Sequence, residues 1–211
     1  MATEKLPSRL LGILDCGAPF ENLLDLAAAA ERGGLLWLLL RGPDLAGAQR
    51  VRLAKEIGER CPGLFLSIHA DSSAAGKLAR CGLHYPARLI GEARSKRPRG
   101  PLGVSAHDEG ELTAAKAAGA DYCFLSPVFP PSSKPPERLP LGLEGFGRLA
   151  AGVGLPVYAL GGIGPEHVRE LGNRGAAGVA VLGGIFSAAD VTAATAAYVS
   201  AVGEAYRKAY G

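Results

Sequence analysis

The sequence is poor in cysteine, in charge of one sign and in long apolar runs. Its four cysteines, Cys16, Cys61, Cys81 and Cys123, lie far apart and form no CxxC pair, which indicates neither a zinc knuckle nor a disulfide framework. No apolar run reaches the about 20 residues that span a bilayer, and residues 1–5 do not open a secretory signal. We therefore expect no membrane partner and a cytoplasmic location.

Charge is also only weakly biased. The formal net charge is +3, and the basic side chains are scattered except for a short run from Arg94 to Arg99, which is typical of a solvated loop. The sequence thus predicts no nucleic-acid partner. With 48% hydrophobic and 20% charged residues, the chain is expected to fold, and its length favours one domain over residues 1–211.

What the sequence does contain is a repeat of short apolar runs, each followed by a turn and then by a stretch with helical spacing. The runs predict strands at residues 10–15, 35–41, 64–69, 82–85, 102–105, 122–127, 156–161 and 178–182. The stretches between them predict helices at residues 21–32, 46–60, 73–80, 109–118, 143–150, 165–174 and 188–210.

This alternation predicts the fold. Residues 35–40 and 178–182 are almost wholly apolar, as is typical of parallel strands that are buried on both faces. Gly119 and Gly175 follow helical stretches, where glycine ends a helix in the left-handed conformation. Eight strand–helix units favour a single closed (β/α)8 barrel, the TIM barrel, with an open doubly wound sheet as the alternative.

Two glycine-rich corners stand at the ends of the last two predicted strands. Gly161 and Gly162 follow the seventh strand, and Leu182, Gly183 and Gly184 follow the eighth. Because glycine has no Cβ atom, backbone amides at these corners can approach an anion closely, and the helix that follows favours negative charge. Such corners are a recurrent phosphate site in barrels, so we predict phosphate binding here. The alternative is that these glycines only form tight turns.

A serine and a histidine end the fifth predicted strand. Ser105 or His107 is expected to point into the mouth of the barrel. A histidine with its ordinary pKa of about 6.5 can move protons near neutral pH. The alternative is that His107 caps the helix that follows.

A long loop rich in proline and serine follows the sixth strand, over residues 127–141. Loops of this length in compact proteins are usually lids or binding segments. Ser132, Ser133 and Lys134 offer hydroxyls and a cation that suit phosphate or pyrophosphate. The alternative is a disordered surface segment.

Together these segments resemble the thiamine phosphate synthase superfamily, which includes the TenI-type thiazole tautomerases. The resemblance implies a barrel, a phosphate site at the last two loops, substrate contacts from Arg41 and Ser126, and a role in vitamin B1 synthesis. It extends from the first strand to Phe186, in the family's order and spacing. Its most specific parts are residues 103–107, 119–122, 126–134, 142–144, 159–163 and 175–181.

The chain departs from the superfamily's synthases at their metal site. Those enzymes join a pyrimidine diphosphate to a thiazole phosphate and use Mg2+ to steady the departing pyrophosphate. Here Gly42 and Pro43 replace an acid and a lysine. Ala70 replaces one metal-binding aspartate, and residues 86–89 lack another. Asp71 is nearby, but a shift of one residue on a strand turns a side chain to the opposite face. We therefore predict no metal ligand, and Mg2+ only if the chain is a synthase.

The leading hypothesis is a TenI-like tautomerase that acts on a small phosphorylated heterocycle. By this likeness His107 moves a proton on a thiazole carboxylate phosphate, while His69 is a second proton carrier, a substrate contact or a packed strand residue. One alternative is a thiamine phosphate synthase that recruits metal through Asp71 or substrate oxygens. Another is a barrel that binds a phosphorylated ligand and catalyses nothing. A homodimer is the default assembly. We assign no role to His84 and place Trp37 in the core.

Overall fold

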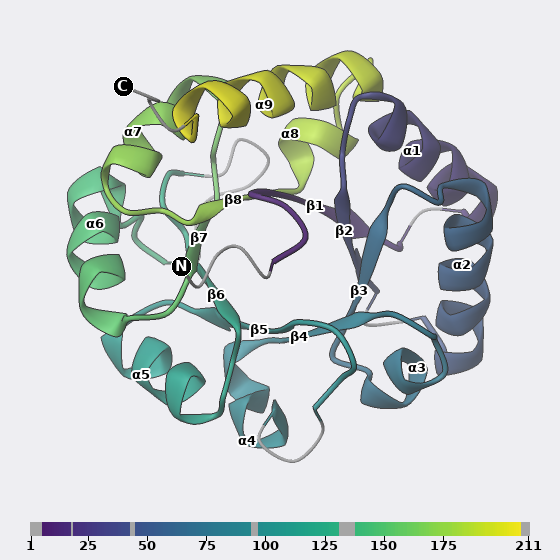
Figure 1. Ribbon diagram of the computed structural model, residues 1–211, viewed down its shortest axis with the longest axis horizontal. Helices are drawn as coiled ribbons and strands as arrows, with labels where there is room; N and C mark the ends of the chain where they lie inside the picture. Colours follow the sequence, from purple (N-terminus) through teal and green to yellow (C-terminus); the bar gives the residue numbers. More distant parts are fainter. Residues whose placement is uncertain (1–5, 18, 43–44, 94–96, 131–137, 208–211) are drawn as a thin grey trace.

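The computed structural model of the chain describes residues 6–17, 19–42, 45–93, 97–130 and 138–207. Eight parallel strands close into a barrel, each paired with the next and the eighth with the first (Figure 1). This confirms the predicted (β/α)8 barrel. The strands are β1 (Leu10–Asp15), β2 (Trp37–Arg41), β3 (Phe65–His69), β4 (Gly82–Tyr85), β5 (Leu102–Ala106), β6 (Tyr122–Leu125), β7 (Val157–Leu160) and β8 (Gly178–Val181).

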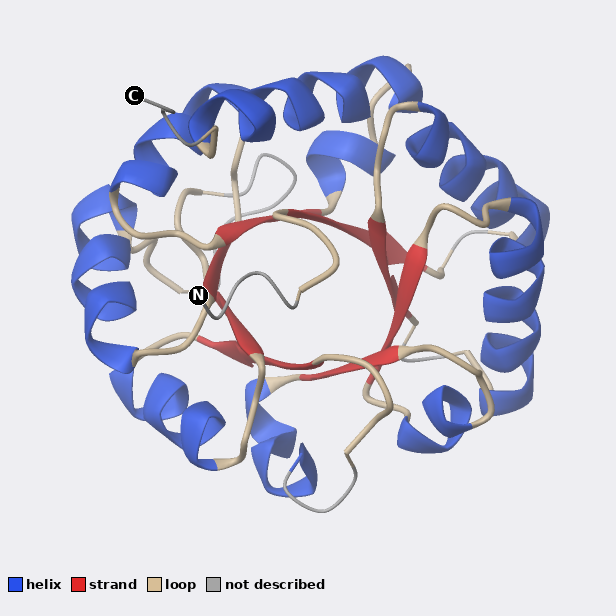
Figure 2. Cartoon of the chain, in the orientation of Figure 1, coloured by secondary structure: helices blue, strands red, loops and turns tan. Residues whose placement is uncertain are grey.

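Helices surround the barrel and cover the outer face of the strands (Figure 2). In the described part of the chain they are α1 (Phe20–Arg32), α2 (Gly47–Arg60), α3 (Ser72–Gly76), η2 (Ala87–Leu89), α4 (Ile90–Ala93), α5 (Glu109–Ala117), α6 (Gly142–Val153), η3 (Pro165–His167), α7 (Val168–Asn173), α8 (Gly183–Phe186) and α9 (Val191–Ala205).

Several predicted boundaries were wrong for local reasons. The helix predicted over 188–210 begins at Val191, because the Asp190 carboxylate accepts a hydrogen bond from the Ala193 amide at 2.9 Å and caps the helix there. The helix predicted over 73–80 ends at Gly76. Two short helices, α4 and α8, were not predicted, since four residues carry too little periodicity to be recognised.

The strands bury side chains on both faces. In β2, Trp37 and Leu39 point into the barrel, and Leu38 and Leu40 pack outward against the helices. Trp37 is fully buried, as predicted for a core residue, and its ring lies 4.9 Å from that of Tyr122 in an edge contact. Buried faces on both sides explain why β2 is continuously apolar rather than alternating.

The same alternation directs polar side chains into one end of the barrel. Asp15 and Arg41 end β1 and β2, lie opposite each other in the strand register, and form an ion pair. Because the eight strands are parallel, all their carboxyl ends meet at one rim, which we call the mouth. No helix among the described residues is long and apolar enough to cross a membrane.

Candidate active site at the mouth of the barrel

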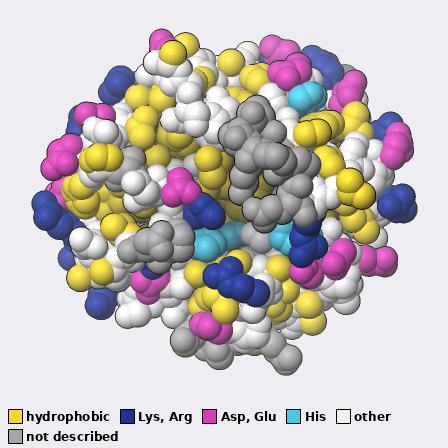
Figure 3. All heavy atoms as spheres, turned by 180° about the vertical axis from the view of Figure 1, so that it is seen from behind, with side chains coloured by type: hydrophobic (Ala, Val, Ile, Leu, Met, Phe, Trp, Pro, Cys, Tyr) yellow, Lys and Arg dark blue, Asp and Glu magenta, His cyan; other side chains and the backbone are white. Residues whose placement is uncertain are grey.

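The mouth collects most of the residues that the sequence singled out. Arg41, His69, Ser105 and His107 lie at or just beyond the ends of β2, β3 and β5, and the glycine corners follow β7 and β8. Figure 3 views the molecule from behind Figure 1 and shows histidine, lysine and arginine side chains gathered near the centre of this face. The predicted contacts Ser132, Ser133 and Lys134 lie outside the described residues.

The corner after β7 needs glycine for its backbone. Gly161 and Gly162 have φ values of 100° and 62°, in the region that residues with a side chain rarely adopt. A Cβ atom on Gly162 would also overlap the Pro130 carbonyl and Phe129, because the loop after β6 passes directly over this corner. Backbone conformation and tight packing therefore account for both glycines, while Gly162 itself remains exposed.

The corner after β8 is built around a tyrosine of the last helix. The Tyr198 hydroxyl donates a hydrogen bond to the Ile163 carbonyl at 2.8 Å, which fixes the loop after β7. The same hydroxyl occupies the space where a Cβ atom of Gly184 would lie. Tyr198 is 3% exposed, so this contact is buried beneath the two corners. One side chain of α9 thus holds both predicted phosphate loops side by side.

His107 is held at the rim by its neighbours. Its Nδ1–H donates to the Ser126 carbonyl at 2.7 Å, and its backbone amide donates to Glu111 Oε2 at 2.7 Å. The α5 helix is capped instead by Asp108, whose carboxylate accepts from the Glu111 amide at 2.9 Å, so the capping role considered for His107 was wrong. The Ser126 hydroxyl lies 3.4 Å from the same Nδ1.

His84, to which the sequence assigned no role, lies fully inside the barrel under Ser105. Its Nε2 is 2.9 Å from the Ser105 hydroxyl, and its Nδ1 is 3.1 Å from the Tyr122 hydroxyl. Deeper still, the Trp37 indole N–H donates to the Ser67 hydroxyl at 2.9 Å. Complete burial lowers the pKa of His84 well below its usual value, and nearby His69 adds to this effect. His84 is therefore neutral at physiological pH.

These buried contacts form a chain of hydrogen bonds with one favoured direction. The indole N–H can only donate, so Ser67 accepts from it and is free to donate to Tyr122, a bond that partly offsets the rise in the Tyr122 pKa caused by burial. Tyr122 then donates to Nδ1 of neutral His84, whose Nε2–H donates to Ser105. With Ser105 accepting from His84, its O–H is available to donate to an oxygen of a bound ligand.

His69 ends β3, with its ring 6.4 Å from that of His84. Burial lowers the pKa of His69 to about 4, with smaller contributions from Arg41, Arg50 and Arg88, while Asp15 opposes them. A group with this pKa is neutral near pH 7 and holds a proton poorly. The site therefore suits His69 better as a substrate contact than as the proton carrier that the sequence suggested.

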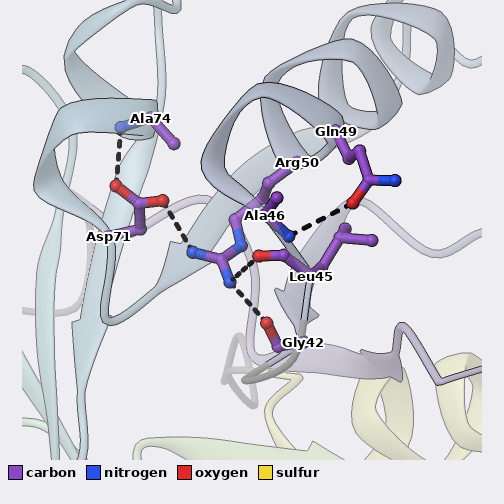
Figure 4. A network of polar contacts seen from close by, with 7 residues as sticks. All are labelled: Gly42, Leu45, Ala46, Gln49, Arg50, Asp71 and Ala74. Atoms are coloured by element: carbon purple, nitrogen blue, oxygen red, sulfur yellow. Dashed lines mark hydrogen bonds and ion pairs between the residues drawn. The ribbon is translucent and has the colours of Figure 1, made fainter.

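An arginine of α2 holds together the loops that follow β2 and β3 (Figure 4). The Arg50 guanidinium donates to Asp71 Oδ2 at 2.7 Å, to the Leu45 carbonyl at 2.9 Å and to the Gly42 carbonyl. The second Asp71 oxygen accepts from the Ala74 amide at 2.8 Å and caps α3. Both carboxylate oxygens of Asp71 are thus engaged by the protein itself.

These residues do not fit Mg2+, which the family resemblance implies for a synthase. Mg2+ takes oxygen ligands, usually one or two carboxylates together with substrate phosphates and water. Asp15 is paired with Arg41, and Asp71 is paired with Arg50 and Ala74. In the part of the chain that the structure describes, no group of three or more histidine, cysteine, aspartate or glutamate side chains could hold a metal ion.

The fold and the site define a (β/α)8 barrel that gathers polar side chains and exposed glycine corners at the carboxyl ends of its strands. The thiamine monophosphate synthase family matches residues 10–185, and the chain belongs to this family. The thiamine-phosphate synthase of Caldivirga maquilingensis is 31% identical over 205 residues, covering 95% of this chain and 100% of that protein. The thiamine-phosphate synthase of Chloroflexus aurantiacus is 37% identical over 170 residues, covering 79% of each. Thiamine phosphate pyrophosphorylase from Pyrococcus furiosus shares the fold, with a TM-score of 0.76 at 23% identity over 93% of this chain and 96% of that one.

Family membership confirms the predicted superfamily and the link to thiamine biosynthesis, and it corrects the predicted reaction. Curated relatives at 31–37% identity are named thiamine-phosphate synthases, which contradicts the expectation of a thiazole tautomerase. The expectation was wrong because it relied on missing carboxylates. The absence of a carboxylate shows which charge a site lacks. It does not show which bond is formed or broken there.

Sequence reasoning missed three residues that shape the mouth: His84, Arg50 and Tyr198. For His84 a signal existed, since the period of two along β4 places it on the face opposite the outward-packed Leu83. For Arg50 and Tyr198 no local signal exists. Their partners Asp71 and Ile163 are 21 and 35 residues away in the chain.

Proposed function

We propose that this protein is a thiamine-phosphate synthase, which joins a pyrimidine carried as its diphosphate to a thiazole phosphate and releases pyrophosphate. The observation that carries the proposal is the agreement among curated relatives, since synthases that cover 79–95% of this chain share 31–37% of its residues. The exposed glycine corners and the inward-facing polar side chains at the mouth support it.

The mouth has two sides that suit the two substrates. The glycine side, formed by the loops after β7 and β8, offers backbone amides at Gly161, Gly162, Gly183 and Gly184 to the thiazole phosphate. The arginine side, formed by the ends of β2, β3 and β4 with η2, offers side-chain donors to the diphosphate. Ser105 and His107, on β5 and just after it, lie between the two sides.

In the reaction the bond to the diphosphate breaks and pyrophosphate leaves with the electron pair, so negative charge grows on the leaving group. The Ser105 O–H, aimed at the mouth by His84, can donate to an oxygen of that group. Arg41 is 43% exposed in its side chain and can turn from Asp15 to the same oxygens. His107 contacts the substrates from the rim with the Nε2 that its bond to Ser126 leaves available.

The test is formation of thiamine phosphate and pyrophosphate from the two precursors, measured once with Mg2+ and once with EDTA. We expect product in at least one condition, and a loss of about a hundredfold in kcat for Ser105→Ala, as for removal of one donor to developing charge. Ser200→Ala is the matched control, because Ser200 is exposed on the outer helix α9. Binding of both precursors without product in either condition would overturn the proposal and favour a barrel that only binds phosphorylated ligands.

A further inference from the structure

The arginine side of the mouth carries more positive than negative charge. Arg41 and Arg50 are each paired with one aspartate. Arg88, in η2 directly after β4, is exposed, and no ion pair between described residues includes it. Arg41, Arg50 and Arg88 thus give three positive charges. Among the described residues at the ends of β1 to β3 only the carboxylates Asp15 and Asp71 oppose them, so that one positive charge remains in excess in this set.

Arg41 is also available to an anion. Its pair with Asp15 is solvent-exposed, with 43% and 42% of the two side chains accessible. Exposed pairs of this kind contribute little to stability, so a more negative partner can displace the aspartate. The arginine fork matches phosphate oxygens in a bidentate arrangement. His69 between the arginines is neutral, because burial and the arginines lower its pKa to about 4, so it competes with neither.

The backbone at the end of β3 is strained where a carboxylate is absent. Ala70 has a φ of 53°, and among the described residues other than glycine it alone has a positive φ. Aspartate and asparagine adopt this left-handed conformation more readily than alanine does. The position thus suits an acidic residue without a change of backbone conformation. It carries a methyl group instead, next to Asp71, whose carboxylate is engaged by Arg50 and by the Ala74 amide.

We propose that this protein binds the diphosphate group without a divalent metal ion, and that Arg41 and Arg88 supply the positive charge in its place. The identity of the ligand rests on the proposed function. The metal-free binding rests on the paired carboxylates and the excess arginine described here.

The direct test is titration of the protein with inorganic pyrophosphate by calorimetry, in EDTA and in Mg2+. We expect pyrophosphate to bind in EDTA, and Arg88→Gln to weaken this binding by about tenfold, as for loss of one charge-assisted contact. Arg99→Gln removes the same charge from the exposed segment before β5, at the opposite end of the barrel, and should leave the affinity unchanged. Binding that occurs only with Mg2+, or equal losses in both variants, would overturn the proposal.

A second pair of variants tests whether the absence of a carboxylate at position 70 prevents Mg2+ binding. Ala70→Asp should make pyrophosphate affinity respond to Mg2+, while Ala70→Asn, which suits the same backbone conformation without charge, should not. An Mg2+ response of the wild type equal to that of Ala70→Asp contradicts the inference.

The coupling assay separates this inference from the proposed function. Product formation together with pyrophosphate binding that occurs only with Mg2+ retains the synthase and overturns metal-free binding. Pyrophosphate binding in EDTA without product in any condition retains metal-free binding and overturns the synthase.

Discussion

The two sides of the mouth are built on different principles. On the glycine side the expected donors are backbone amides, and the loops that carry them are fixed by Tyr198 and by contact with Phe129 and Pro130. On the arginine side the expected donors are side chains, held by the ion pairs of Arg41 and Arg50. A backbone donor survives most substitutions, whereas a side-chain donor is lost with one. The difference teaches that single substitutions should change ligand binding more on the arginine side than at the glycine corners.

The largest expected effect is a loss of stability when an ion pair of the arginine side is removed. Arg50→Leu should lower the free energy of unfolding by about 3–5 kcal/mol, because it leaves the half-buried Asp71 carboxylate and the Gly42 and Leu45 carbonyls without their donor. Urea unfolding measures the loss. Arg52→Leu on the same helix is the control, since Arg52 is 71% exposed and should change stability little. Equal losses would mean that the buried pair does not hold the loops.

A smaller effect should appear when the glycine side is overpacked. Gly184→Ala places a methyl group against the Tyr198 hydroxyl, which we expect to cost about 1–3 kcal/mol of stability and to weaken inorganic phosphate binding. Gly183→Ala is the neighbouring control, because its Cβ would meet only Ser187 Oγ, at 3.7 Å. Calorimetric titration with phosphate compares the two. A phosphate affinity unchanged in Gly184→Ala would remove this corner from the binding site.

A smaller change tests whether Tyr198 supports phosphate binding on the glycine side. Tyr198→Phe removes the hydrogen bond to the Ile163 carbonyl and should cost about 1 kcal/mol. Tyr206→Phe removes an equivalent bond to the Ala176 carbonyl, 2.9 Å long, at the amino end of β8. Both variants should lose similar stability, but only Tyr198→Phe should weaken phosphate binding, by about threefold. Equal phosphate affinities would show that Tyr198 supports the fold and not the site.

The smallest effect concerns pH on the arginine side. Unfolded His69 takes up a proton near pH 6.5, while burial holds its folded pKa at about 4, so stability should fall as pH drops through this window. At pH 6 the loss is below about 1 kcal/mol. His69→Gln should show a shallower decline in the free energy of unfolding, measured with denaturant, between pH 7 and pH 6. Buried His84 acts in the same direction in both proteins and cancels in the comparison. Identical slopes would contradict the burial of His69.

The barrel could be predicted because the strand–helix pattern repeats along the sequence. The exact ends of the strands could not be predicted, because hydrogen bonding to the neighbouring strands decides them. Residues 35–40 are all apolar, yet β2 begins only at Trp37, since Leu36 is 53% exposed and Leu35 lies outside the paired strand. Likewise the strand predicted over 122–127 ends at Leu125. Apolar composition tells that a strand exists nearby, whereas its ends depend on the neighbouring strand.

The residues of the mouth could be predicted where they stand at the ends of strands. They could not be predicted where they depend on contacts between residues far apart in the sequence. Arg41, Ser105 and His107 lie at or just beyond the carboxyl ends of their strands, and parallel strands all end at one rim, so the order of strands alone brings these residues together. The ion pair of Asp71 depends on Arg50. The sequence pattern alone does not tell whether the Arg50 side chain faces solvent or the neighbouring loop. Such contacts between helices follow from packing, which a single sequence does not specify.

Trp37 gives the barrel a built-in optical reporter. It is the only tryptophan of the chain, it is fully buried, and its indole N–H is bonded to Ser67 at the inner end of the chain that leads to Ser105. Intrinsic fluorescence therefore follows the hydration of the barrel interior without any label. A ligand that accepts a hydrogen bond from Ser105 should change the hydrogen bonds of His84 and Tyr122 and, through them, the fluorescence emission of Trp37. Ligand binding at the mouth can therefore be measured from the emission of this buried residue.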